Sequence, residues 1–148
     1  MRLDSLTSQR VNQDNRPNLI RKLVLGSTFF KRDGLYPTFW ESLSHSTLSD
    51  MPQQLKDAYT KVAPNTNNLS RMYEKDKKRM LEFEDWKTED IHSIYAPTLI
   101  MIGDKDVGRP EHAVEMFRLL SNAGLSILPG AHGAYIGSSI RNGTQQDP

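Results

Sequence analysis

The chain has 148 residues, which suits one domain with a moderate core, and a hydrophobic content of 36%. Its 19 Lys and Arg residues nearly balance its 18 Asp and Glu residues, and the resulting net charge of +1 argues against general electrostatic binding to nucleic acid or an anionic membrane. The absence of cysteine excludes disulfides, thiolate metal sites and a cysteine nucleophile, and the absence of any long apolar run favours a cytoplasmic location.

The first two thirds of the chain contain one predicted strand and two predicted helices. IRKLVLGS (20–27) is typical of a short buried strand, because three apolar residues stand together before a glycine. A loop with an Asp-Gly turn is expected over 28–37. Apolar residues at helical spacing then predict an amphipathic helix over 52–63, with a proline at each end, and a looser helical stripe over 67–83.

The last third reads as a strand, a helix and another strand. PTLIMIG (97–103) is a continuous apolar run, as expected for a strand covered on both faces, and LSIL (125–128) is the next strand. Between them a helix is predicted over 111–120, with Pro110 at its start and an inward stripe of Ala113, Val114, Met116, Phe117 and Leu120. A crossover of this kind is right-handed, so the two strands are predicted to be parallel.

Titratable side chains follow both of these strands. Asp104 and Asp106 come after the strand that ends at Gly103, and His132 comes after the next strand, in the compact sequence GAHG. Because the carboxyl ends of parallel strands meet at one edge of a sheet, the two loops are expected to lie close together. A carboxylate there can accept the Nδ1 proton of the imidazole and leave Nε2 free to take a proton from a nucleophile.

At this point the chain resembles the α/β-hydrolase family. APTLIMIGDKDVGRPEHAVEMFRLL (96–120), followed by LSILPGAHG (125–133), looks like the family's acid loop, the next helix and the histidine loop. Residues 20–37 are similar to the preceding strand and the loop into the cap. The resemblance implies Asp106 as the acid and His132 as the base of a catalytic triad, with Asp104 as the alternative acid.

The resemblance also implies the fold. We expect an α/β protein with a partial α/β-hydrolase fold: a short parallel sheet of about three strands, flanking helices and a helical cap insertion. Residues 1–34 and 95–148 form the C-terminal part of the core in this interpretation, and residues 35–94 form the cap. Aromatic side chains are candidates for a substrate pocket, although cap packing explains them equally well: Phe29, Phe30, Phe39, Trp40 and Tyr135.

The family's nucleophile, a serine in a G-x-S-x-G turn, has no counterpart in this sequence. Ser5 in LDSLT is the remaining candidate, although it lacks both glycines of the turn. One expectation is therefore a fragment of a serine-type hydrolase that acts on an ester or similar small acyl substrate, uses no cofactor, and is inactive alone. The alternative is a non-catalytic remnant that binds or assembles through the cap helices or an exposed sheet edge.

Three further expectations concern the surface of the chain. The strand at 20–27 should have a bare outer edge carrying Leu23, Val24 and Leu25, which predicts a homo-oligomer or a poorly stable monomer. No pair of histidines has the spacing of metal ligands, so no metal site is expected. The histidines away from the strand ends are expected at the surface: His45, His92 and His112. Ser27 is expected in a turn.

Overall fold

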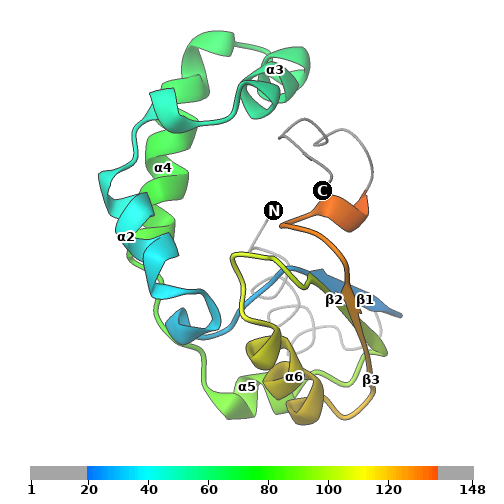
Figure 1. Cartoon of the computed structure of the whole chain (residues 1–148). Helices are drawn as coiled ribbons and strands as arrows, with labels where there is room; N and C mark the ends of the chain where they lie inside the picture. Colours follow the sequence, from blue (N-terminus) through cyan, green and yellow to red (C-terminus); the bar gives the residue numbers. More distant parts are fainter. Residues whose placement is uncertain (1–19, 137–148) are drawn as a thin grey trace, which may run out of the picture. The chain divides into compact units, whose positions relative to one another are not determined.

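A computed structural model describes residues 20–136 (Figure 1). Within this range the chain forms two compact units. One contains residues 20–36 and 84–136, and the other contains residues 37–83. No helix in the described part of the chain is both long enough and apolar enough to cross a membrane.

The first unit is built on a three-stranded parallel sheet. The strands are β1 (Leu23–Gly26), β2 (Thr98–Gly103) and β3 (Ala123–Leu128), in the order β1-β2-β3. In the register of the sheet, Ile100 on β2 pairs with Leu25 on β1 and with Leu125 on β3. The predicted parallel sheet of three strands is confirmed. The central strand has the longest apolar run because it has neighbours on both sides.

Helices α5 (Thr88–His92) and α6 (Pro110–Leu119) cover one face of this sheet (Figure 1). Helix α6 begins at Pro110, where a proline costs nothing because the first backbone N–H groups of a helix have no partner within the helix. The buried core joins residues from the sheet and both helices: Leu25, Phe30, Ile91, Ile94, Ile100, Ile102, Ala113, Met116 and Leu120. The hydrophobic effect of this single layer stabilises the unit.

The inward side of α6 differs from the predicted stripe. Ala113, Met116 and Leu120 are buried as predicted, whereas Phe117 is 37% exposed. His112, which was expected at the surface, is buried with 4% exposure, so that expectation was wrong. Helical spacing alone could not reveal this burial, because the cover comes from the distant residues after β1.

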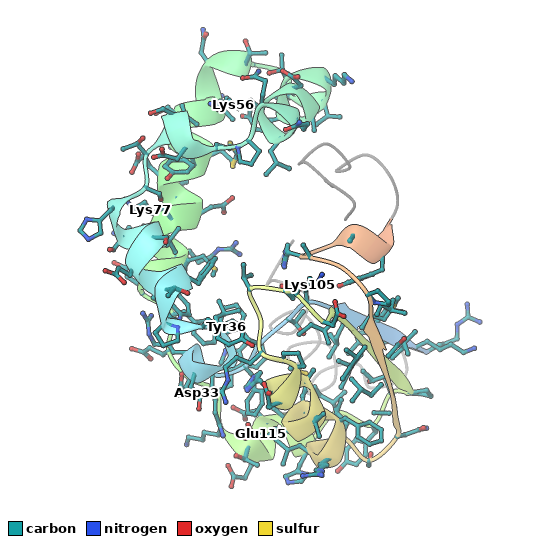
Figure 2. All side chains as sticks on the ribbon, in the orientation of Figure 1. Asp33, Tyr36, Lys56, Lys77, Lys105 and Glu115 are labelled. Atoms are coloured by element: carbon teal, nitrogen blue, oxygen red, sulfur yellow. The ribbon has the colours of Figure 1, made fainter. Side chains whose placement is uncertain are left out.

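His112 joins α6 to the segment that leaves β1. Its ring stacks on Phe30 with 4.6 Å between the ring centroids, and its Nε2 accepts a hydrogen bond from the Phe30 N–H at 3.2 Å. Its Nδ1 faces Glu115 at 3.5 Å and Asp33 at 3.9 Å, two carboxylates labelled in Figure 2. Burial lowers the pKa of His112, and the two carboxylates oppose this effect.

The segment after β1 stays in the first unit as far as Tyr36, and the range 35–94 expected for a cap stays a prediction. Leu35 forms an antiparallel bridge with Gly108, and the Tyr36 N–H donates to the Val107 carbonyl at 3.2 Å, so both residues belong to the first unit. Beyond the second unit, the Trp86 N–H donates to the Phe30 carbonyl at 2.8 Å. Ile91 on α5 and Ile94 after it are then buried in the core of the first unit.

The second unit is helical. It contains α2 (Pro37–His45), α3 (Gln53–Val62) and α4 (Leu69–Leu81), and its 3-10 turns are Leu48–Asp50 and Thr66–Asn68. Helices α3 and α4 lie where helical spacing predicted them, whereas no element was predicted over the residues that form α2. The Ser46 hydroxyl pairs with the Tyr73 hydroxyl at 2.7 Å, which links the end of α2 to α4. That this unit is a substrate cap stays a prediction.

We expect the stability of the chain to fall as the pH drops below about 6.5. The unfolded chain binds a proton at position 112 near the ordinary histidine pKa of 6.5, whereas burial makes the folded chain bind it only at a lower pH. The unfolded state therefore gains protons first, and urea unfolding at a series of pH values measures the effect. His112→Gln should flatten this slope, whereas His45→Gln, at an exposed position, should leave it; equal slopes in all three proteins would contradict the account.

Candidate active site

The carboxyl ends of the three strands bring together the polar residues of the site. Ser27 directly follows β1, Asp104 and Asp106 follow β2, and His132 follows β3 just before a 3-10 turn, η4 (Ala134–Ile136). In a parallel sheet these ends share one edge, so residues far apart in sequence become neighbours. Figure 2 labels Lys105, which lies in the loop between the two aspartates.

Asp106 and His132 form a direct hydrogen bond. The Nδ1 atom of His132 lies 2.8 Å from Oδ1 of Asp106. The carboxyl side chain is fully buried, whereas the imidazole side chain is 44% exposed. The Gly108 N–H donates to the same carboxylate oxygen at 3.1 Å. An ionised carboxylate only accepts hydrogen bonds, so Nδ1 carries the imidazole proton and Nε2 keeps its lone pair.

The donors around Asp106 keep it ionised. Burial by itself raises the pKa of this carboxyl group, but hydrogen bonds from His132, Ser27 and the Gly108 N–H outweigh burial and lower the pKa from 3.8 to about 2. This shift stabilises the folded chain by about 2 kcal/mol at pH values above 3.8. The contribution is lost as the pH falls from 3.8 through about 2, because the folded state then takes up the proton too.

Ser27 is a member of this cluster that sequence reasoning placed only in a turn. Its hydroxyl donates to Oδ2 of Asp106 at 2.5 Å and lies 2.7 Å from the Tyr135 hydroxyl. Ser27 is 5% exposed and has φ of 50°, in the left-handed region. The rule that selected Asp106 and His132, a polar residue in the loop after a parallel strand, also selects Ser27. What the sequence did not reveal is the direction of its side chain.

The alternative acid, Asp104, has a different partner. Its carboxylate accepts the Gly130 N–H at 2.8 Å, and the Asp104 N–H donates to the Leu128 carbonyl at 2.8 Å. The Lys105 N–H donates to the Gly130 carbonyl at 3.1 Å. These bonds tie the loop after β2 to the loop after β3. His132 therefore pairs with Asp106. Asp104 instead binds the backbone of Gly130, in the loop that contains His132.

Glycines make this close contact between the loops feasible. Gly130 and Gly133, on either side of His132, have φ of 123° and 71°, which residues with a Cβ rarely adopt. A Cβ on Gly103 would overlap the carbonyl oxygen of Gly130. The glycines of GAHG thus let the chain turn sharply after β3 and place the imidazole beside the acid.

The remaining sequence candidates are distributed over the whole chain. Ser5 lies outside the described residues. Phe29 and Phe30 are buried in the first unit, Phe30 within its core, whereas Phe39 and Trp40 pack edge to face in the second unit with ring centroids 5.2 Å apart. Tyr135 contacts Ser27. That these aromatic residues line a substrate pocket stays a prediction. Within residues 20–136, no group of three or more His, Cys, Asp or Glu side chains is arranged to hold a metal ion.

Comparison with known proteins gives the fold. No protein-family model matches the sequence, and no curated protein matches it. A solved meta-cleavage product hydrolase from Pseudomonas fluorescens superimposes with a TM-score of 0.53 at 12% identity, covering 86% of this chain and 54% of that one. An enol-lactonase from Burkholderia xenovorans gives 0.56 at 14% identity, covering 90% and 57%. A serine hydrolase involved in carbazole degradation gives 0.58 at 19% identity, covering 89% and 53%.

The first unit and its strand-end loops therefore belong to a partial α/β-hydrolase fold. The chain spans about half the length of the solved hydrolases that it matches. At these levels of identity the likeness defines the fold, while any catalytic role has to be argued from the side chains of the site.

Replacing Gly103 by alanine tests how closely the two loops approach. We expect Gly103→Ala to destabilise the chain by about 1–3 kcal/mol, because the new methyl group overlaps the rigid backbone after β3. Gly124→Ala is a matched control on β3, where an added Cβ meets only the Leu99 side chain at 3.6 Å, an ordinary contact. Urea unfolding measures both, and equal effects would show that the loops are less tightly joined.

Proposed function

We propose that this chain supplies the acid and base of a serine-type hydrolase that acts on an ester or a similar small acyl substrate. The observation that carries the proposal is the 2.8 Å hydrogen bond between a fully buried, ionised carboxylate and a histidine whose other side is open. Asp106 holds the imidazole in one tautomer and stabilises its protonated form. His132 is then a general base whose Nε2 faces away from the acid.

The chemistry follows from this arrangement. A serine hydroxyl transfers its proton to Nε2 of His132 while its oxygen attacks the acyl carbonyl, and the resulting imidazolium is stabilised by Asp106. The imidazolium then protonates the leaving group, and the acyl-serine forms. In the second half, water gives its proton to Nε2 and attacks the acyl-serine. The imidazolium then returns this proton to the serine oxygen as the bond to the acyl group breaks, which releases the acid and restores both residues.

The nucleophile of this proposal is not Ser27. That residue is 5% exposed, and its only hydroxyl proton is donated to Asp106, so Nε2 of His132 has no access to it. The attacking serine is therefore a different residue, and Ser5, which lies outside the described residues, is the candidate that the sequence offers. The solved enol-lactonase and serine hydrolase support acyl chemistry on this fold without fixing the substrate.

Acylation by diethyl pyrocarbonate tests the acid–base pair directly, because this reagent reacts with a free imidazole lone pair. We expect His132 to react readily, since its side chain is 44% exposed and its proton is held on Nδ1, whereas buried His112 should react slowly. Asp106→Asn should slow the reaction of His132 several-fold by favouring the wrong tautomer. Mass spectrometry of peptides measures each site.

Two outcomes would count against the proposal. An unchanged rate at His132 in Asp106→Asn would show that the carboxylate does not control the imidazole. For the nucleophile, the purified chain should hydrolyse p-nitrophenyl acetate no faster than its His132→Ala variant. Steady turnover that disappears in His132→Ala but persists in Ser5→Ala would place the nucleophile at a residue of this chain other than Ser5.

The exposed residues of β1 favour a second candidate function, a non-catalytic assembly module. Val24 is 62% exposed, whereas Leu25, also expected on a bare edge, is buried beneath the helices. The Leu23 and Ser27 N–H groups donate towards β2, so the alternation of a parallel strand directs the N–H groups of Val24 and Gly26 outwards. An apolar strand with outward donors is suited to pairing with the same strand of a second copy.

Sedimentation of single variants tests this alternative. If β1 mediates self-association, Val24→Lys should convert an oligomer into a monomer, because a charged side chain on an edge opposes strand pairing. Val62→Lys, on α3, is the matched comparison at a position with 81% exposure. Dissociation by Val62→Lys instead would move the contact to the helical unit. If the protein without substitutions is already a monomer, assembly of this kind is excluded.

A further inference from the structure

The two oxygens of the Asp106 carboxylate are held by different parts of the first unit. Oδ1 accepts from His132 and from the Gly108 N–H, at 2.8 and 3.1 Å. Oδ2 accepts from Ser27 at 2.5 Å. The hydrogen bond from Ser27 crosses from β1 to β2 and has no part in the proton transfers described above.

The directions of the hydrogen bonds around Ser27 follow from counting protons. Ser27 has a single hydroxyl proton, and this proton goes to the carboxylate, which only accepts. At its 2.7 Å contact with Tyr135, Ser27 can therefore only accept, so the phenol is the donor. The longer contact of 3.3 Å from Tyr135 to the Met101 carbonyl is then secondary. The result is a series of hydrogen bonds in which Tyr135 donates to Ser27 and Ser27 donates to Asp106. His132 donates to the other oxygen of the same carboxylate.

This series of hydrogen bonds limits the rotation of the Asp106 carboxyl group. The terminal torsion of an aspartate side chain is soft, so a single bond to Oδ1 leaves its plane poorly fixed. A donor on each oxygen fixes the plane. The side chain of Asp106 is fully buried, so without Ser27 its second oxygen would lack a partner, and rotation towards another donor would weaken the bond to His132.

We propose that Ser27 is a positioning residue for the acid, and that Tyr135 in turn positions Ser27. The inference rests on the proposed role of Asp106 as the partner of His132. Ser27 fixes the carboxylate so that Oδ1 faces the Nδ1 proton, and this keeps the lone pair of Nε2 open to solvent.

The backbone at Ser27 supports this role. Its φ of 50° lies in the left-handed region, which is unfavourable for a residue with a Cβ, whereas a glycine adopts it readily. What a serine adds at this position is the hydroxyl group that Asp106 accepts from. The preceding Gly26 leaves room for the phenol, because a Cβ there would lie 3.0 Å from the Tyr135 hydroxyl.

Two variants remove the contacts separately. Ser27→Gly deletes the hydroxyl and relieves the backbone, and Tyr135→Phe deletes only the phenol oxygen that donates to Ser27. Ser93→Ala is the control, since it removes a serine hydroxyl that bonds the Asp90 carbonyl at 2.7 Å on another part of the unit. Three quantities are measured on the full chain: the His132 tautomer by ¹⁵N NMR, its acylation rate with diethyl pyrocarbonate, and the Asp106 pKa by ¹³C NMR.

We expect Ser27→Gly to lower the acylation rate of His132 by about threefold or more, towards the value of Asp106→Asn, and to increase the share of imidazole protonated on Nε2. The Asp106 pKa should rise by about one unit with the loss of a hydrogen bond to the charged form. Tyr135→Phe should cause smaller changes of the same sign, and Ser93→Ala should cause none.

The possible failures are distinguishable. If Ser27→Gly and Tyr135→Phe leave the tautomer and the acylation rate unchanged while Asp106→Asn lowers the rate, Ser27 has only a structural role and the inference is overturned. If Asp106→Asn also changes nothing, the proposed acid–base pair itself is overturned. Thermal melts of each variant show whether a change in rate comes from a loss of folding. Tyr135→Phe is the variant least expected to unfold, because it removes one oxygen and keeps the packed ring.

Discussion

The first unit depends on keeping one buried carboxylate ionised. Desolvation opposes the charge on Asp106, and hydrogen-bond donors from the loops after the three strands offset this cost. The donors are Ser27 after β1, the Gly108 N–H within the loop after β2, and His132 after β3. Because each donor comes from the end of a different strand, satisfying this carboxylate also holds the three strand ends in register.

A second buried polar group, His112, joins the segment after β1 to helix α6. His112 accepts the Phe30 N–H and stacks on the Phe30 ring, so it fixes the segment between β1 and the helical unit against α6. Both sites follow the same rule, that a buried polar atom is tolerated when its partners are supplied from distant parts of the chain. They differ in charge: the donors around Asp106 keep it ionised, whereas burial favours the neutral form of His112.

The sheet is covered unequally on its two faces. Helices α5 and α6 bury Leu25, Ile100 and Ile102 on one face, whereas Val24 and Leu99, which point to the other, are 62% and 40% exposed. The solved hydrolases that share this fold are about twice as long as the part of them that matches. Within residues 20–136 these apolar side chains stay exposed on one face of the sheet, and a further packed layer would bury that face.

The sequence by itself determined the three strands, α3, α4, α6, the parallel pairing, and the two loops that carry Asp106 and His132. These follow from local periodicity, from glycine and proline positions, and from the resemblance of residues 96–133 to a known fold. The structure showed that Asp106, which the resemblance favoured over Asp104, meets the imidazole. Tertiary structure alone decided that Ser27 holds the second carboxylate oxygen and that His112 is buried. The physical reason is that hydrogen-bond partners and burial are set by segments that lie 26 to 82 positions apart, and the direction of a side chain after a strand depends on backbone torsions that the residue type does not reveal.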